Sequence, residues 1–173
     1  MLDAVERIEV SLRSRWANQM ALRHGAMCLQ RANLFRDADL HRRSLESLEH
    51  FYGNSTDEFT LNFRAKYPRQ DLPPIWICSE MLSLGQLGKW IGNFRERRDR
   101  QDVAVAYGLD EECLLSFVSH LTEVRNLSAH HSRLWNRTFE PFLLPAHPPG
   151  AMLPLNRKRP ERLYNTLEIG RAS

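Results

Sequence analysis

The stretch EVRNLSAHHSRLWNR, residues 123–137, brings together side chains that suit cleavage of a phosphodiester bond. His130 carries an imidazole, whose ordinary pKa of about 6.5 lets it give and take protons at neutral pH. Arg125 carries a permanently charged, forked donor that matches phosphate oxygens and stabilises charge in a transition state. Asn126 is suited to orient the imidazole or a phosphate. These residue types suit RNA cleavage without a metal, with proton transfer from a ribose 2′-hydroxyl or to a 5′-oxygen leaving group.

The spacing of these three residues fits a single helix face only in part. Each helical residue advances by about 100°, so Asn126 and His130, four positions apart, share a face, whereas Arg125 lies about 140° from His130. A guanidinium that curls round the helix, an irregular helix end or a second copy of the protein would each bring Arg125 and His130 together. By itself, the pattern is more typical of a helix end whose Arg and His contact the terminal carbonyls.

Six further residues are candidates for positioning the site or contacting substrate: Glu9, Arg13, His131, Arg133, Asn136 and Arg137. Glu9 and Arg13 lie one helical turn apart, which suits a surface ion pair or a first helix that orients the motif. His131 points about 100° away from His130, which suits packing, capping or substrate contact. The last three residues have a spacing that suits a track for phosphates.

Other kinds of site lack their signatures in this sequence. The histidines have neither the H-E-x-x-H spacing nor the paired C-x-x-C partners of a zinc site. GQLGKWIGNF, residues 85–94, lacks the spacing of a phosphate-binding loop, and no nucleophile elbow accompanies Ser128 or Ser132. The sequence therefore predicts neither a metal nor a cofactor.

Composition places the chain among ordinary soluble proteins. It has 173 residues, enough for one domain with a core, and no apolar run that could span a membrane. Its three cysteines, Cys28, Cys78 and Cys113, are far apart and odd in number, which predicts reduced, buried thiols in the cytoplasm. The net charge is +3, but from His120 onward eight Lys or Arg stand against four Glu, which favours a polyanionic partner such as RNA.

Helical periodicity dominates the chain and predicts an all-α fold. Helices are expected within residues 2–24, 37–54, 55–67, 71–94, 95–108 and 110–131. Gly25 is a predicted stop, Ser55 or Thr56 a predicted cap that forms a capping box with Glu58, and Asp110 a predicted cap of the last of these helices. Residues 71–94 read as one central buried helix, which begins near Pro73 and Pro74.

The segment after Phe139 differs from the rest of the chain in composition. Five prolines from Pro141 to Pro154 exclude a continuous helix and predict an extended arm, followed by a short terminal helix in RKRPERLYNTLEIGRAS. We therefore expect a helical domain over residues 1–140, with residues 141–173 packed on the same domain as a Pro-rich arm.

The run VRNLSAHHSRLWNR strongly resembles the signature of the Abi-like proteins, bacterial abortive-infection proteins placed in the HEPN superfamily. The nuclease motif of that superfamily is Arg, a polar residue, three variable residues and His. Other stretches resemble the family in the same order: RIEVSLRSR, DEFTLNFRAKYP, LPPIWICSEMLSLGQLGKW and KRPERLYNTLEI. The resemblance thus spans nearly the whole chain. Family members usually carry more chain before the first of these stretches, so this sequence suits either a short variant or a truncated one.

The resemblance implies a HEPN-type helical bundle, usually a homodimer, in which the motifs of two protomers face each other across a cleft. It places the motif on Arg125, Asn126 and His130, and it implies a metal-independent endoribonuclease that leaves 2′,3′-cyclic phosphates. The leading hypothesis is therefore antiphage abortive infection by RNA cleavage. The alternative is a non-catalytic RNA-binding or scaffold protein. A toxin held silent by an antitoxin protein or a small regulatory RNA is compatible with either.

Overall fold

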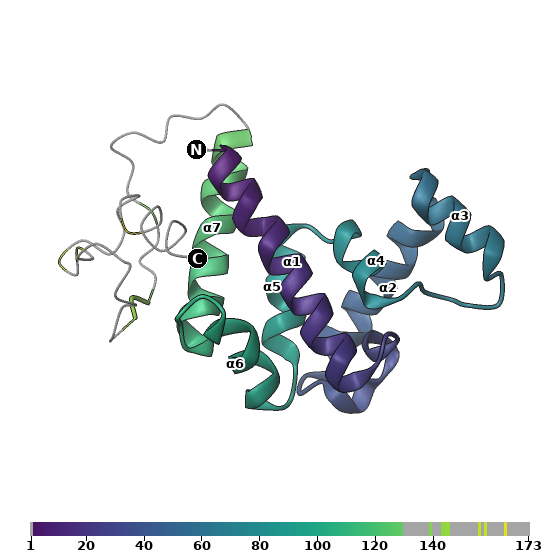
Figure 1. Cartoon of the computed structure of the whole chain (residues 1–173), viewed down its shortest axis with the longest axis horizontal. Helices are drawn as coiled ribbons and strands as arrows, with labels where there is room; N and C mark the ends of the chain where they lie inside the picture. Colours follow the sequence, from purple (N-terminus) through teal and green to yellow (C-terminus); the bar gives the residue numbers. More distant parts are fainter. Residues whose placement is uncertain are drawn as a thin grey trace. The chain divides into compact units, whose positions relative to one another are not determined.

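The structure is a computed structural model that describes residues 2–129, 139, 143–145, 156, 158 and 165. Within these residues the regular elements are seven α-helices and two short 3-10 helices, Cys28–Gln30 and Ala32–Leu34. The α-helices are α1 (Leu2–His24), α2 (Ala38–Asn54), α3 (Glu58–Lys66), α4 (Ile75–Met81), α5 (Leu84–Asn93), α6 (Arg97–Val105) and α7 (Glu111–Ala129) (Figure 1). The β-structure of this part of the chain is one isolated bridge between Phe35 and Phe94. The predicted all-α class is confirmed.

The chain divides into two compact units. Unit 1 contains residues 2–12 and the described residues from Arg100 onward, and unit 2 contains residues 13–99. α1 contributes its first half to unit 1 and its second half to unit 2. Within the described part of the chain, no helix is both long enough and apolar enough to cross a membrane.

Unit 1 is built on the apolar faces of α1 and α7. Buried side chains recur at helical spacing on the first half of α1 and along α7: Val5, Ile8, Leu12, Leu114, Phe117, Val118, Leu121 and Val124. The Ser11 hydroxyl lies 3.0 Å from the Tyr107 hydroxyl, so a hydrogen bond links α1 to the turn after α6. Gly108 takes a φ of +64° in that turn, a conformation that favours glycine. The predicted apolar face of the last helix is confirmed.

Unit 2 is built around α2, which packs against α4 and α5. Trp16, Trp90 and Leu87 are fully or almost fully buried there. The predicted stop of the first helix at Gly25 is confirmed: this residue takes a φ of +84°, and its N–H donates to the Ala21 carbonyl at 2.8 Å. The two residues before Gly25 contact α6. Arg23 lies 2.7 Å and His24 lies 2.9 Å from the carboxylate of Asp99, a buried residue of α6.

The prediction of one helix over residues 71–94 is wrong. The chain forms α4 and α5 with a break at Leu82 and Ser83, where the backbone is extended. The Ser83 side chain accepts from the N–H of Gln86, and the Gln86 side chain accepts from the N–H of Ser83. This capping box satisfies the first amides of a new helix, which stabilises a helix start in the middle of the apolar run.

The predicted capping box at the start of α3 is also wrong. The residue in the cap position is Asp57, and no side chain caps the helix there. The Ser55 hydroxyl instead donates to the Asp57 carboxylate at 3.1 Å, so the serine is used in the turn that precedes the helix. The predicted arm over residues 141–173 and its terminal helix lie almost entirely outside the described residues.

Candidate functional site

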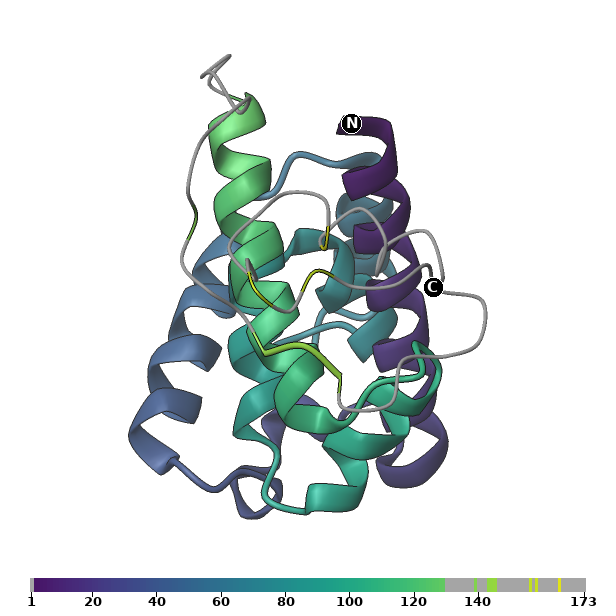
Figure 2. The ribbon, with the colours of Figure 1, turned by 90° about the vertical axis from the view of Figure 1, so that its left-hand side faces the viewer.

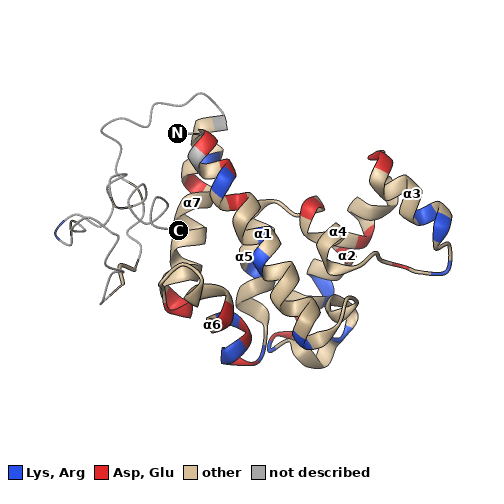
Figure 3. Cartoon of the chain, viewed as in Figure 1, with Lys and Arg blue, Asp and Glu red and all other residues tan. Residues whose placement is uncertain are grey.

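α7 carries the described part of the candidate cleavage motif. Its start is fixed by Asp110, whose carboxylate accepts from the N–H of Cys113 at 2.8 Å, as the sequence predicts for this cap. That hydrogen bond to the Cys113 N–H is the main reason why the pKa of Asp110 is lowered. Glu111 and Glu112 follow in the first turn, where negative charge is favourable to the helix dipole. Figure 3 shows acidic residues, in red, at the start of this helix.

Two contacts from α6 position this helix start within unit 1. Arg100 Nε donates to Glu111 Oε2, and both side chains are buried. Gln101 bridges the same junction, because its Nε2 donates to the Leu109 carbonyl and its Oε1 accepts from the Glu111 N–H, each at 3.2 Å. The beginning of α7 is therefore held by a buried ion pair and by hydrogen bonds to the backbone.

Arg125 and Asn126 lie on the last turns of α7, and both are exposed. Within the described residues no hydrogen bond or ion pair holds either side chain, so both remain able to contact a ligand. Figures 1 and 2 show that this end of α7 and the first turns of α1 lie at the same end of unit 1. Five predicted site residues lie outside the described residues: His130, His131, Arg133, Asn136 and Arg137.

The two candidates on α1 belong to different units. Glu9 belongs to unit 1 and is buried, with 8% of its surface exposed, so it does not lie on the surface where an exposed ion pair would form. Arg13 belongs to unit 2, where its Nη2 donates to the Leu82 carbonyl at 2.7 Å and its Nη1 lies 3.8 Å from Glu80. Arg13 thereby covers the C-terminal end of α4, a favourable place for a cation.

Two polar residues of α7 whose types also suit other chemistry, Ser128 and His120, are buried. The Ser128 hydroxyl donates to the Val124 carbonyl at 2.7 Å, which occupies the proton that a nucleophilic serine would have to release. The His120 ring lies edge-on to Phe139 with the ring centres 5.3 Å apart. Among the described residues no three His, Cys, Asp or Glu side chains are grouped as metal ligands.

In the basic stretch RERRDR, residues 95–100, the first three of the four arginines are exposed and the fourth is buried. Arg95 donates to the Phe35 carbonyl, and Arg100 is buried against Glu111. Arg97 and Arg98 are exposed. Arg95 and Arg100 therefore stabilise the positions of neighbouring segments, a role that the composition of the stretch alone does not show.

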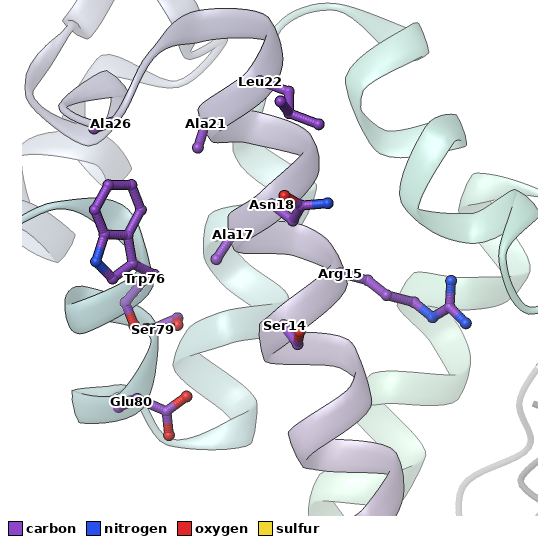
Figure 4. Close-up of a pocket in the computed structure, with 10 residues that line it drawn as sticks. All are labelled: Ser14, Arg15, Ala17, Asn18, Ala21, Leu22, Ala26, Trp76, Ser79 and Glu80. Carbon is purple, nitrogen blue, oxygen red and sulfur yellow. Dashed lines mark hydrogen bonds between the residues drawn. The ribbon is translucent and has the colours of Figure 1, made fainter.

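A pocket of about 670 Å³ lies between α1 and α4 in unit 2 (Figure 4). Ala17 and Ala21 face Trp76 across it, whereas Arg15 extends away from the indole on the other side of α1. Glu80 is the carboxylate in this pocket. Because the carboxylate of Glu80 would repel an anion and the indole and alanine side chains are apolar, this pocket suits an apolar group better than a phosphate.

The three cysteines are buried, as predicted, and desolvation raises the pKa of each thiol. The pKa of Cys28 rises from 9.0 to about 11, and those of Cys78 and Cys113 rise to about 12. The stability that these protonated thiols contribute is complete below pH 9.0 and is lost as the pH rises through the raised values.

We expect slow alkylation of all three thiols by iodoacetamide in the native protein at about pH 8, because the reactive thiolate is scarce and shielded. Unfolding in guanidinium should make all three react quickly. Mass spectrometry of time points, with and without the denaturant, measures this difference. Fast modification of Cys113 in the native protein would show that its environment is more open than this structure has it.

A comparison with protein-family models finds one match, to the Abi-like protein family, over residues 1–136. No curated protein and no solved structure gives a significant match. The matched region contains α1 to α7 together with the stretch from Arg125 to His130. Because the match covers well over half of the 173 residues and includes every described helix, the chain belongs to the Abi-like protein family.

Proposed function

We propose that this protein is a metal-independent endoribonuclease of the HEPN type that acts in abortive infection. The observation that carries the proposal is the place of Arg125 and Asn126, exposed on the last turns of α7 inside the region that matches the family. His130 follows directly after the last residue of α7 in sequence. Family membership supports the role in abortive infection, and the residue types support the chemistry.

In the proposed reaction, His130 acts as the general acid or base and Arg125 binds the scissile phosphate. Attack by the ribose 2′-oxygen on phosphorus forms a cyclic phosphate and breaks the bond to the 5′-oxygen, which leaves with a proton. The 2′-hydroxyl loses its proton to a base, so the step balances without a metal. Arg125 stabilises the charge that develops on the phosphate oxygens, and Asn126 orients the phosphate or the imidazole.

A composite site formed by two protomers is part of the proposal. Arg125 and His130 point about 140° apart on an ideal helix, so one copy holds them awkwardly for a single phosphate. A homodimer that places two motifs opposite each other supplies Arg and His from different directions. Glu9, buried in unit 1, is proposed to position the motif indirectly, while His131, Arg133, Asn136 and Arg137 are proposed contacts to the RNA.

The test is incubation of the purified protein with a mixed RNA pool in EDTA, followed by analysis of the fragment ends. Fragments that carry 2′,3′-cyclic phosphates, produced by the wild type and absent with His130→Ala, would support the proposal. Cleavage that requires an added divalent metal would contradict it. Stable binding of RNA without turnover would instead favour the non-catalytic RNA-binding or scaffold role.

A further inference from the structure

A second pocket in unit 2 has the chemistry of an anion site. It lies between α2 and α5 and has a volume of about 320 Å³. Its lining combines five side chains that donate hydrogen bonds with three apolar ones: Arg43, Ser44, Ser47, Gln86, Lys89, Leu40, Leu82 and Trp90. No carboxylate belongs to this lining, in contrast to the pocket that contains Glu80. The pocket therefore offers positive charge and donors over an apolar floor.

α5 contains no acidic residue that could form an ion pair with Lys89. α5 has the sequence LGQLGKWIGN, in which Lys89 is the one charged residue. No carboxylate of α5 is thus available to form an ion pair with it along the helix. Lys89 is exposed and lines the pocket together with side chains contributed by α2.

Arg43 brings a second charge to the pocket from α2. Its Nε donates to the Asp39 carbonyl at 3.3 Å, and within the described residues its two Nη groups are not used. The acids closest along α2 engage Arg42 instead, since Arg42 lies 2.9 Å from Glu46 and 3.8 Å from Asp39. Arg42 is thus neutralised on its own helix, whereas Arg43 is not.

Contacts with neighbouring side chains hold Trp90 and the Ser47 hydroxyl of the pocket in place. Trp90 is buried, and its ring packs edge-on against Phe35 at 5.3 Å and His41 at 5.7 Å between ring centres. Gln86 Nε2 donates to the Ser47 hydroxyl oxygen at 3.5 Å, which leaves the hydroxyl proton of Ser47 able to donate to a ligand. Because Gln86 also forms the capping box of α5, its side chain is held before any ligand arrives.

We propose that the pocket between α2 and α5 binds a phosphate group of a nucleotide or a nucleic acid. A fork from Arg43 and an ammonium from Lys89 provide charge-assisted hydrogen bonds to phosphate oxygens, with Ser44 and Ser47 as neutral donors. The volume holds a phosphate and part of its nucleoside, and the apolar floor of Leu82 and Trp90 suits the less polar part of that ligand. The proposal is independent of any cleavage at Arg125.

The test measures binding to the full-length protein by calorimetry and by ¹H–¹⁵N NMR, with three probes. These are inorganic phosphate, adenosine monophosphate and a ten-nucleotide RNA with 2′-O-methyl riboses, which resists cleavage through the 2′-oxygen. We expect saturable shifts of the Gln86 side-chain amide and the Trp90 indole with at least one probe. Arg43→Gln and Lys89→Gln should each weaken that binding about tenfold or more, as the loss of a hydrogen bond to a charged group predicts.

Arg42→Gln is the matched control, since it removes the same charge from the adjacent position of the same helix and does not line the pocket. Its affinity should stay within about twofold of the wild type, because its charge is already paired. Equal affinity for the monophosphate and the oligonucleotide would identify a free nucleotide as the ligand, and much tighter oligonucleotide binding would identify an RNA backbone. Absence of saturable shifts with all three probes, or an equal loss in Arg42→Gln, would overturn the proposal.

Discussion

The His130→Ala variant is expected to cleave RNA at least about 100-fold more slowly than the wild type, because general acid–base catalysis by a positioned side chain contributes about 10² to 10⁴. RNA affinity should change little, since the imidazole acts on protons and the charge of Arg125 remains. Arg125→Ala should lower the rate by about 10² to 10³ through lost stabilisation of the transition state. Arg125→Lys, which keeps the charge and loses the fork, should recover part of that rate.

The measurement is single-turnover cleavage of a labelled RNA in EDTA, with binding followed by a gel shift. His131→Ala is the matched control, because it removes the neighbouring imidazole, which points elsewhere on a helix. The double variant Arg125→Ala, His130→Ala should lose less than the product of the single effects if the two groups act on one phosphate. Unchanged cleavage by both single variants would remove Arg125 and His130 from the mechanism.

The second large effect concerns stability. Glu111→Ala should lower the free energy of unfolding by about 3 kcal/mol, because it leaves the guanidinium of Arg100 buried without its carboxylate. Urea denaturation followed by circular dichroism measures this change. RNA cleavage should fall as well if the start of α7 must be fixed for Arg125 to be placed correctly.

Glu112→Ala is the control for this experiment. Glu112 occupies the next position in the same first turn but is exposed, so its loss should change the stability by no more than about 0.5 kcal/mol. An equally small effect of both substitutions would show that the Arg100–Glu111 pair contributes no more than a surface ion pair. Replacement of the pair by Met and Leu should restore much of the lost stability, because well-packed apolar residues avoid the cost of desolvating two charges.

The helices were predictable because each one buries an apolar stripe that recurs along the sequence. The stripe of α7 from Leu114 to Val124 is an example, and its cap at Asp110 was predicted from one residue. The break between α4 and α5 was missed because the apolar residues continue through it. Ser83 and Gln86 have the spacing of a capping box, so this local signal was present in the sequence.

The candidate site was predictable to a smaller extent. Residue types and spacing identify Arg125 and Asn126, and the structure adds that both are exposed. The partner of a buried charge depends on segments that meet only in the folded chain. Arg13 contacts the end of α4, 69 residues further along the chain, and Arg100 pairs with Glu111 on the next helix. Whether a given lysine or arginine is exposed is therefore known only from the folded structure.

Unit 1 is assembled from the two ends of the described chain, which has a consequence for biosynthesis. The first half of α1 leaves the ribosome first, but α7 and the larger part of α6, which complete its unit, are made only after residues 13–99. Until then Val5, Ile8 and Leu12 have no completed unit to cover them. Translation that stops before α7 therefore yields a chain without Arg125 and with an uncovered apolar helix, a form that quality-control proteases readily remove.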